Sequence, residues 1–159
     1  MKKYEFTGET KEIRLLFRTA TLHRIRATVA FGIVEVGDLG GWIEKEENLS
    51  HEGKAWVWGN AEVWGNAKVW GNAEVFSASH VLVIGAIGSR NDFTTFYRDK
   101  DNEITVKCGC FLGKIDRFLE KVTQTHGDSK YALVYRAAVE VAKLQIDLSG
   151  EAPKDADEE

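Results

Sequence analysis

The sequence has few cysteines, no long apolar run and no export signal, and each absence narrows the class of protein. Its two cysteines, Cys108 and Cys110, stand one residue apart, which is too close for an easy disulfide and is typical of a reduced protein. No apolar run is long enough to cross a membrane. The start, Met-Lys-Lys-Tyr-Glu-Phe-Thr, lacks the apolar segment of a secretory signal. We therefore expect a cytoplasmic protein with no membrane partner.

Most of the chain also lacks net charge. The formal charge is −4, and residues 151–159 carry five acids against Lys154, so the rest balances at 20 acids and 20 bases. A neutral body argues against generic nucleic-acid binding. The sequence has no phosphate-binding loop, zinc-protease, serine-hydrolase or dinucleotide-binding motif. Cys108 and Cys110 have no second pair at zinc spacing. We expect no cofactor, no metal and no catalytic residue.

What the sequence does have is a six-residue unit repeated almost without error over residues 55–76. This periodicity is typical of a parallel β-helix, with an aliphatic residue pointing inward and a corner at each Gly-Asn. Glycine and asparagine suit the corner because they reach positive φ at low steric cost. A six-residue period drifts round an α-helix, which excludes that alternative. The predicted inward positions are Val57, Val63, Val69, Val75, Val81 and Ile87, with Ala61, Ala67 and Ala73 at the bends.

The repeat frame predicts a mainly β fold in four parts. Eight units make a little under three coils, in which residues 18 apart, such as Val57 and Val75, lie above one another. Both ends of so short a stack expose strand edges, so they need caps. The predicted parts are an N-terminal β cap (1–44), a short parallel β-helix of hexapeptide repeats (45–92), a β-hairpin and two-helix module (93–147) and a disordered acidic tail (148–159).

The segment after the repeat predicts a hairpin and two helices. Residues 93–98 and 104–108 are rich in β-forming residues and flank a polar turn. A helical stripe then ends at His126-Gly127, and Asp128 or Ser129 can cap a second helix. The stripes consist of Ile115, Phe118, Leu119 and Val122 in the first helix and Tyr131, Val134, Tyr135, Ala138 and Ala142 in the second.

Two resemblances add to this pattern. The hexapeptide units resemble the left-handed β-helix of hexapeptide-repeat acyltransferases, which are usually trimers. The wider chain resembles small phage and prophage β-helix proteins, through Gly-Asp-Leu-Gly-Gly-Trp-Ile-Glu-Lys-Glu-Glu-Asn-Leu-Ser at 37–50, the repeats, Gly-Ser-Arg-Asn at 88–91 and Cys-Gly-Cys-Phe-Leu-Gly at 108–113. The left hand of the β-helix and the setting, a phage gene in a bacterial cytoplasm, are what these resemblances imply.

The aromatic residues of the repeat predict covered outer faces. Trp58, Trp64, Trp70 and Phe76 each follow an inward valine, so they should point outward on all three faces. Aromatic exposure of that extent is unusual on a monomer. We expect a homotrimer or a multiple of trimers, with the flanking strands and helices covering part of the surface. In the other interpretation, one or two of these rings stack on a planar ligand.

The end of the repeat predicts a ligand site. The candidate residues lie either at the break in the repeat pattern or at the junction of the two predicted helices. A helix N-terminus at that junction favours an anion. Arginine offers a bidentate fork to a phosphate or carboxylate, and the others add neutral donors. The alternative is a structural corner in which Arg90 pairs with Asp92. The candidates are Arg90, Asn91, Thr94, Tyr97, Arg98 and His126.

Three functions remain open from the sequence. The preferred one is a non-catalytic protein that sequesters a small anionic or nucleotide-like ligand at an oligomer cleft, as some phage proteins do with bacterial immune signals. The second is a phage inhibitor that binds a host defence protein through its aromatic faces. The third, from the resemblance, is an acyltransferase with His51, His80 or His126 as general base. No loop between the coils is long enough to suggest a coenzyme groove, so catalysis is not expected.

Overall fold

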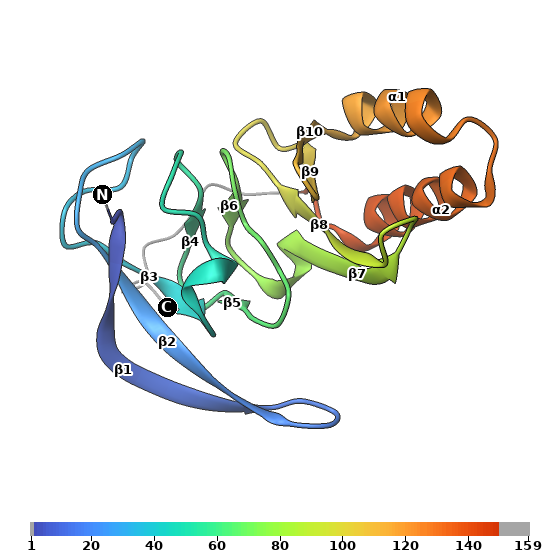
Figure 1. Ribbon diagram of the computed structural model, residues 1–159. Coiled ribbons are helices and arrows are strands. Elements are labelled where there is room, and N and C mark those ends of the chain that lie inside the picture. The colour runs from blue at the N-terminus through green and yellow to red at the C-terminus, as the bar shows by residue number, and fades with distance from the viewer. Residues whose placement is uncertain (1, 150–159) are drawn as a thin grey trace.

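The computed structural model describes residues 2–149 and contains two four-stranded sheets, a short repeat region between them and two helices at one end (Figure 1). The first sheet has the order β1-β2-β3-β5. Its long antiparallel hairpin of β1 and β2 reaches past the body of the molecule, and β3 pairs antiparallel with β2. The strands are β1 (Tyr4–Arg14), β2 (Thr19–Ala27), β3 (Leu39–Ile43) and β5 (Glu62–Val63).

The second sheet has the order β10-β9-β8-β7, and all its pairs are antiparallel. Both helices pack on it through a core that includes Phe96, Val106, Phe118 and Tyr135. The hairpin of β8 and β9 and the two helices are the elements predicted from the sequence. Their bounds are β7 (Val81–Ile87), β8 (Asp92–Arg98), β9 (Ile104–Cys108), β10 (Phe111–Lys114), α1 (Ile115–His126) and α2 (Lys130–Gln145).

The repeat lies between the two sheets and makes short parallel contacts. β4 (Trp56–Val57) pairs with β6 (Glu74–Val75), 18 residues apart as predicted. Upstream, Ile43 pairs with Val63 and Leu49 with Val69, which are 20 residues apart. Short 3-10 turns at Glu46–Asn48 and Ala78–His80 flank this region. Seven of the predicted inward side chains are buried at 0–3% exposure, and they are Val57, Val63, Val69, Val75, Ala61, Ala67 and Ala73. The other two, Val81 and Ile87, are half-buried.

The predicted left-handed parallel β-helix over residues 45–92 is wrong. Parallel pairing is limited to contacts of one or two residues, and the described residues contain no closed or solenoid sheet. From Val81 onward the chain leaves the repeat and forms a seven-residue strand paired antiparallel with β8. A hexapeptide period specifies which side chains are buried, whereas the pairing partner is set by the turns that follow. Trp58, one of the aromatic residues expected to be covered on the outer faces, is 7% exposed and packs edge-on against Phe76, with ring centroids 5.8 Å apart.

β8 is shared between two cores. Phe96 packs with the helices, and its neighbour Tyr97 packs with the buried residues of the repeat. Successive side chains of a strand point to opposite faces, so one strand serves both clusters. Of the predicted disordered tail at 148–159, only residues 148 and 149 fall within the described part of the chain.

Candidate functional site

The ligand residues predicted at the end of the repeat do not form one open site. Arg90 and Asn91 are exposed in the turn between β7 and β8, where Asn91 has a φ of 49° and its N–H donates to the Gly88 carbonyl at 3.3 Å. By contrast, Thr94 and Arg98 are 1% and 6% exposed, and Tyr97 is fully buried. The Gly-Ser-Arg-Asn segment is therefore a turn that reverses the chain.

Three of the predicted residues lie near Tyr135. Thr94 Oγ1 donates to Cys108 Sγ at 3.3 Å, and the His126 ring stacks on Tyr135 with centroids 5.7 Å apart. Burial raises the pKa of the Tyr135 hydroxyl, and the charge of Arg90 acts against that rise. The first contact joins β8 to β9, and the second joins α1 to α2. Only Arg90 remains open to a ligand there.

Arg98 also makes internal contacts. Its Nε donates to Asn102 Oδ1 at 2.7 Å, and its guanidinium lies 4.8 Å from the centre of the Phe76 ring. Its Nη1 is buried and has no hydrogen-bond partner among the described residues. Arg98 therefore connects the β8–β9 turn to the end of the repeat, and a ligand cannot reach it without movement of its neighbours.

The two histidines of the repeat that were considered as general bases accept hydrogen bonds from backbone N–H groups. His51 Nδ1 accepts the Lys3 N–H at 3.0 Å, and His80 Nδ1 accepts the Phe76 N–H at 3.0 Å. Burial lowers the pKa of His80, which keeps the ring neutral in the acceptor form. In each ring the Nδ1 atom, which would take a proton from a substrate, already accepts a hydrogen bond from the backbone. These contacts favour a structural role for both residues.

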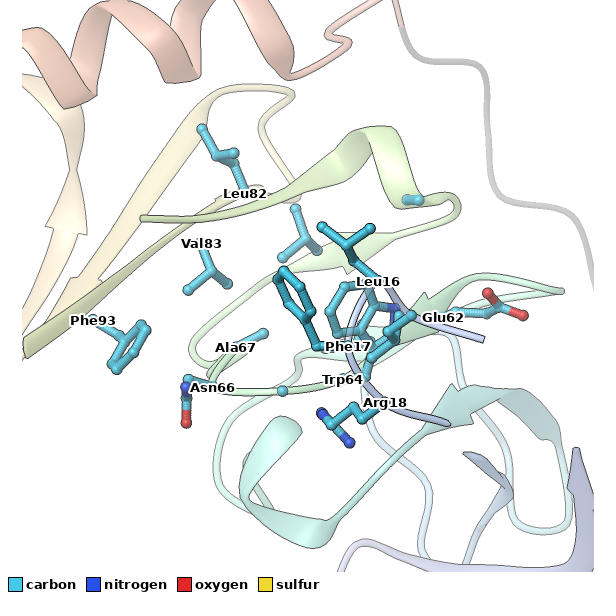
Figure 2. Close-up of a pocket in the computed structure, with 15 residues that line it drawn as sticks. Leu16, Phe17, Arg18, Glu62, Trp64, Asn66, Ala67, Leu82, Val83 and Phe93 are labelled. Atoms are coloured by element: carbon cyan, nitrogen blue, oxygen red, sulfur yellow. The ribbon is translucent and has the colours of Figure 1, made fainter. Parts of the chain in front are cut away.

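An apolar groove of about 570 Å³ lies between the tip of the β1–β2 hairpin, the repeat corner at residues 62–67, and β7 (Figure 2). Figure 2 shows Phe17 and Trp64 on one side of this view and Phe93 on the other, with Val83 between them. We use the term apolar groove for the surface formed by Leu16, Phe17, Trp64, Val83 and Phe93.

The hairpin tip delivers two apolar side chains to the groove. Arg14 and Thr19 are the last paired residues, and the Leu15 N–H donates to the Arg18 carbonyl at 2.7 Å. This tight connection places Leu16 and Phe17 at the apex, where they are 88% and 94% exposed. Turns usually carry polar residues or glycine, so two adjacent large apolar side chains there are informative.

Trp64 reaches the groove from a corner of the repeat. It precedes Gly65, whose φ of 67° belongs to the left-handed region that glycine adopts without strain. The indole is 41% exposed, unlike the buried Trp58 one unit earlier. A ring in this position can stack on a ligand without any other part of the chain moving.

The charges at the rim of the groove are paired. Arg18 makes a bidentate ion pair with Glu44, with N–O distances of 2.6 and 3.0 Å. The Gly65 N–H also donates to Glu44 at 2.8 Å. The Arg18 hydrogen bonds are the main cause that lowers the pKa of Glu44 to about 2. Lys11 pairs with Glu62 at 2.6 Å. The groove therefore offers apolar and aromatic contact with little net charge at its edge.

Sequence reasoning missed this groove because its two sides come from distant segments. The register of the β1–β2 hairpin brings residues 15–18 over residues 62–67, and no periodic pattern encodes that approach. One signal was Trp64, which was expected to point outward and was considered for stacking on a planar ligand. The other was Leu15-Leu16-Phe17, an apolar run within the predicted N-terminal β cap. It indicates an exposed apolar tip only when the hairpin is known.

No residue of the groove carries redox or metal chemistry. Within residues 2–149, no group of three or more His, Cys, Asp or Glu side chains is arranged to hold a metal ion. Cys108 and Cys110 are free thiols. Over the same residues, neither helix has both the length and the apolar character needed to cross a membrane.

No protein-family model matches the chain, and no curated protein matches it at a significant level.

Proposed function

We propose that the protein is a non-catalytic binding protein that sequesters a small molecule with a planar ring in the apolar groove. The observation that carries this proposal is a groove of about 570 Å³ lined by the aromatic residues Phe17, Trp64 and Phe93. Small-molecule sites commonly measure roughly 300–1,000 Å³ and combine apolar walls with a few polar groups. Here the polar side chains in the lining are Arg18, Glu62 and Asn66.

A nucleobase is the ring that these walls suit best. Stacking of one base on an aromatic side chain contributes about 1–3 kcal/mol, and it tolerates different bases because each has a π-face. An anionic group on the same ligand would meet Arg18, which already pairs with Glu44. The ring is therefore the main source of affinity, and phosphates extend toward solvent.

Fluorescence titration and calorimetry test the proposal directly. The probes are adenosine, AMP, cyclic dinucleotides, ADP-ribose and acetyl-coenzyme A. Trp64→Ala should weaken binding by about tenfold or more, because one stacked ring is lost, and Trp64→Phe should retain most of it. Leu144→Ala is the matched control, since Leu144 is 88% exposed on α2, outside the groove.

The outcomes separate this function from its alternatives. If no probe binds and a bacterial protein co-purifies in a fixed ratio that Phe17→Asp abolishes, the protein is instead an inhibitor that binds a host protein through the exposed hairpin tip.

The predicted trimer remains a prediction, and light scattering coupled to size exclusion measures it. Loss of a multimer in Phe17→Asp, with no ligand bound by the wild type, would assign the groove to contacts between copies. Acetyl transfer that depends on His126 would overturn a non-catalytic role.

A further inference from the structure

A second, smaller cavity of about 180 Å³ lies at a different place in the fold and shares no lining residue with the apolar groove. One wall is the tight turn Phe31–Val34, in which the two end residues exchange backbone hydrogen bonds of 2.9 and 2.8 Å. Glu74 and Trp58 belong to the repeat, and Lys100 comes from the turn between β8 and β9.

The cavity gathers polar side chains, of which Lys54, Asn72 and Lys100 are exposed to solvent. Lys54, Trp58, Asn72, Glu74 and Lys100 all line it, and none of their side chains makes a hydrogen bond or ion pair with another described residue. The Trp58 side chain is 93% buried, because the residue is 7% exposed, and its indole Nε1 is among the buried polar atoms without a partner. Buried polar atoms are usually hydrogen-bonded, so this enclosed N–H is an unmatched donor in a residue that lines the cavity. Trp42 and Trp56 have the same unmatched N–H without lining it.

The two lysines are fixed through their backbones to adjacent residues of the repeat. The Lys54 N–H donates to the Gly71 carbonyl at 3.0 Å, and the Lys100 N–H donates to the Asn72 carbonyl at 2.9 Å. Their side chains carry two positive charges against the single carboxylate of Glu74. By contrast, Lys114 pairs with Asp101 at 2.7 Å and with Glu103 at 2.8 Å.

The cavity is smaller than the apolar groove, at about 180 Å³ against about 570 Å³, and so suits a more compact ligand. Its lining nevertheless offers both signs of charge and the apolar faces of Phe31 and Trp58. Burial is the main cause that raises the pKa of Glu74, while Arg98 and Lys100 act against that rise. A carboxylate in this environment gains from a ligand that donates a hydrogen bond to it.

We propose that this cavity binds a compact organic anion that also carries a hydrogen-bond donor. Lys54 and Lys100 take the anionic group, and Glu74 accepts the donor. A small α-amino acid and a small hydroxy acid share this chemistry, because each places a donor one carbon away from a carboxylate. The site is independent of the apolar groove, so either can exist without the other.

The test uses the indole N–H signals of the ¹⁵N-labelled protein in NMR titrations with L-serine, L-lactate, propionate and inorganic phosphate. The Trp58 signal is identified by its loss in Trp58→Phe. We expect L-serine or L-lactate to shift it, and whichever shifts it more assigns the donor as ammonium or hydroxyl. Propionate, which has the carboxylate and no donor, should bind at least about tenfold more weakly, the effect of one hydrogen bond to a charged group.

Variants of the lining residues complete the test. Lys54→Met and Lys100→Met should each weaken binding by about tenfold, whereas Lys130→Met, at the start of α2, should leave it unchanged. Glu74→Gln should weaken L-serine more than phosphate. Melting temperatures of these surface variants show that folding is retained. Absence of any Trp58 shift at millimolar ligand, or equal binding by Lys54→Met, Lys100→Met and Lys130→Met, would overturn the proposal. Phosphate alone shifting Trp58 would mean an adventitious ion only.

Discussion

The repeat and the sheet that follows it bury similar aliphatic residues but pair their strands differently. In the repeat, contacts are parallel, at most two residues long and 18 or 20 residues apart along the chain. In the β7–β10 sheet, neighbours in sequence pair antiparallel along the strand. The repeat therefore depends on side-chain burial for its stability, whereas the later sheet also has continuous backbone ladders. Substitutions in each region measure how far this difference extends.

Val69→Asp should have the largest effect on the repeat. Val69 is fully buried and pairs with Leu49, so an aspartate there would be a buried charge without a partner. We expect the free energy of unfolding to fall by more than about 4 kcal/mol. Chemical denaturation followed by circular dichroism measures it. Lys68→Asp is the control, because Lys68 is the exposed neighbour; an equal loss in both variants would contradict the inward position of Val69.

Phe118→Ala tests whether the packing of the helices on the second sheet is coupled to the repeat. Phe118 is 3% exposed and contacts the rings of Phe96, Phe111 and Tyr135 with centroids 5.4–6.3 Å apart. Truncation of such a buried ring costs about 3–5 kcal/mol. We expect near-ultraviolet circular dichroism of the repeat tryptophans and the helical signal to be lost together on urea titration. Two separate transitions would indicate that the regions unfold independently.

Lys3 makes the stability of the repeat depend on pH. Its ammonium donates to the carbonyls of Ala55 at 2.7 Å and Gly53 at 3.4 Å, and burial lowers its pKa from 10.5 to about 8. Between these two values the unfolded chain binds the proton and the folded protein releases it, so stability rises with pH. We expect about 2 kcal/mol more stability at pH 9.5 than at pH 7.5 from this group. Urea unfolding at both values checks it, and Lys3→Met should remove most of the rise.

Phe17→Ser should change stability least. Its side chain is 94% exposed at the hairpin tip, so the free energy of unfolding should shift by less than about 0.5 kcal/mol. Ligand affinity measured by calorimetry should nevertheless fall, because the groove loses one of its aromatic walls. A large change in melting temperature would show that the tip supports the fold as well as the groove.

The sequence could predict burial in the repeat because valine and alanine recur at fixed spacing, and Val57 pairs with Val75 as that spacing requires. It could also predict α1 and α2, since Ile115, Phe118 and Val122 form a helical stripe that is buried. These signals are local.

The pairing of β7 could not be predicted from the same period. Val81 continues the repeat frame, but it pairs with Tyr97 because Gly88 and Asn91 adopt positive φ and reverse the chain. Of the residues interpreted as a ligand site at this point, Arg90 and Asn91 make the turn, whereas Thr94, Tyr97 and Arg98 belong to β8. The apolar groove and the smaller cavity each combine segments that are far apart in the sequence. The proximity of these segments depends on the sheet register.

The position of β8 between two cores has a consequence for cooperativity. Phe96 and Tyr97 are adjacent and fully buried, yet they belong to different clusters. Opening either cluster would expose one large ring and weaken the strand that the other cluster requires. Local openings of the two regions are therefore energetically coupled, and the amide hydrogens of β8 should exchange with solvent only when the whole protein unfolds.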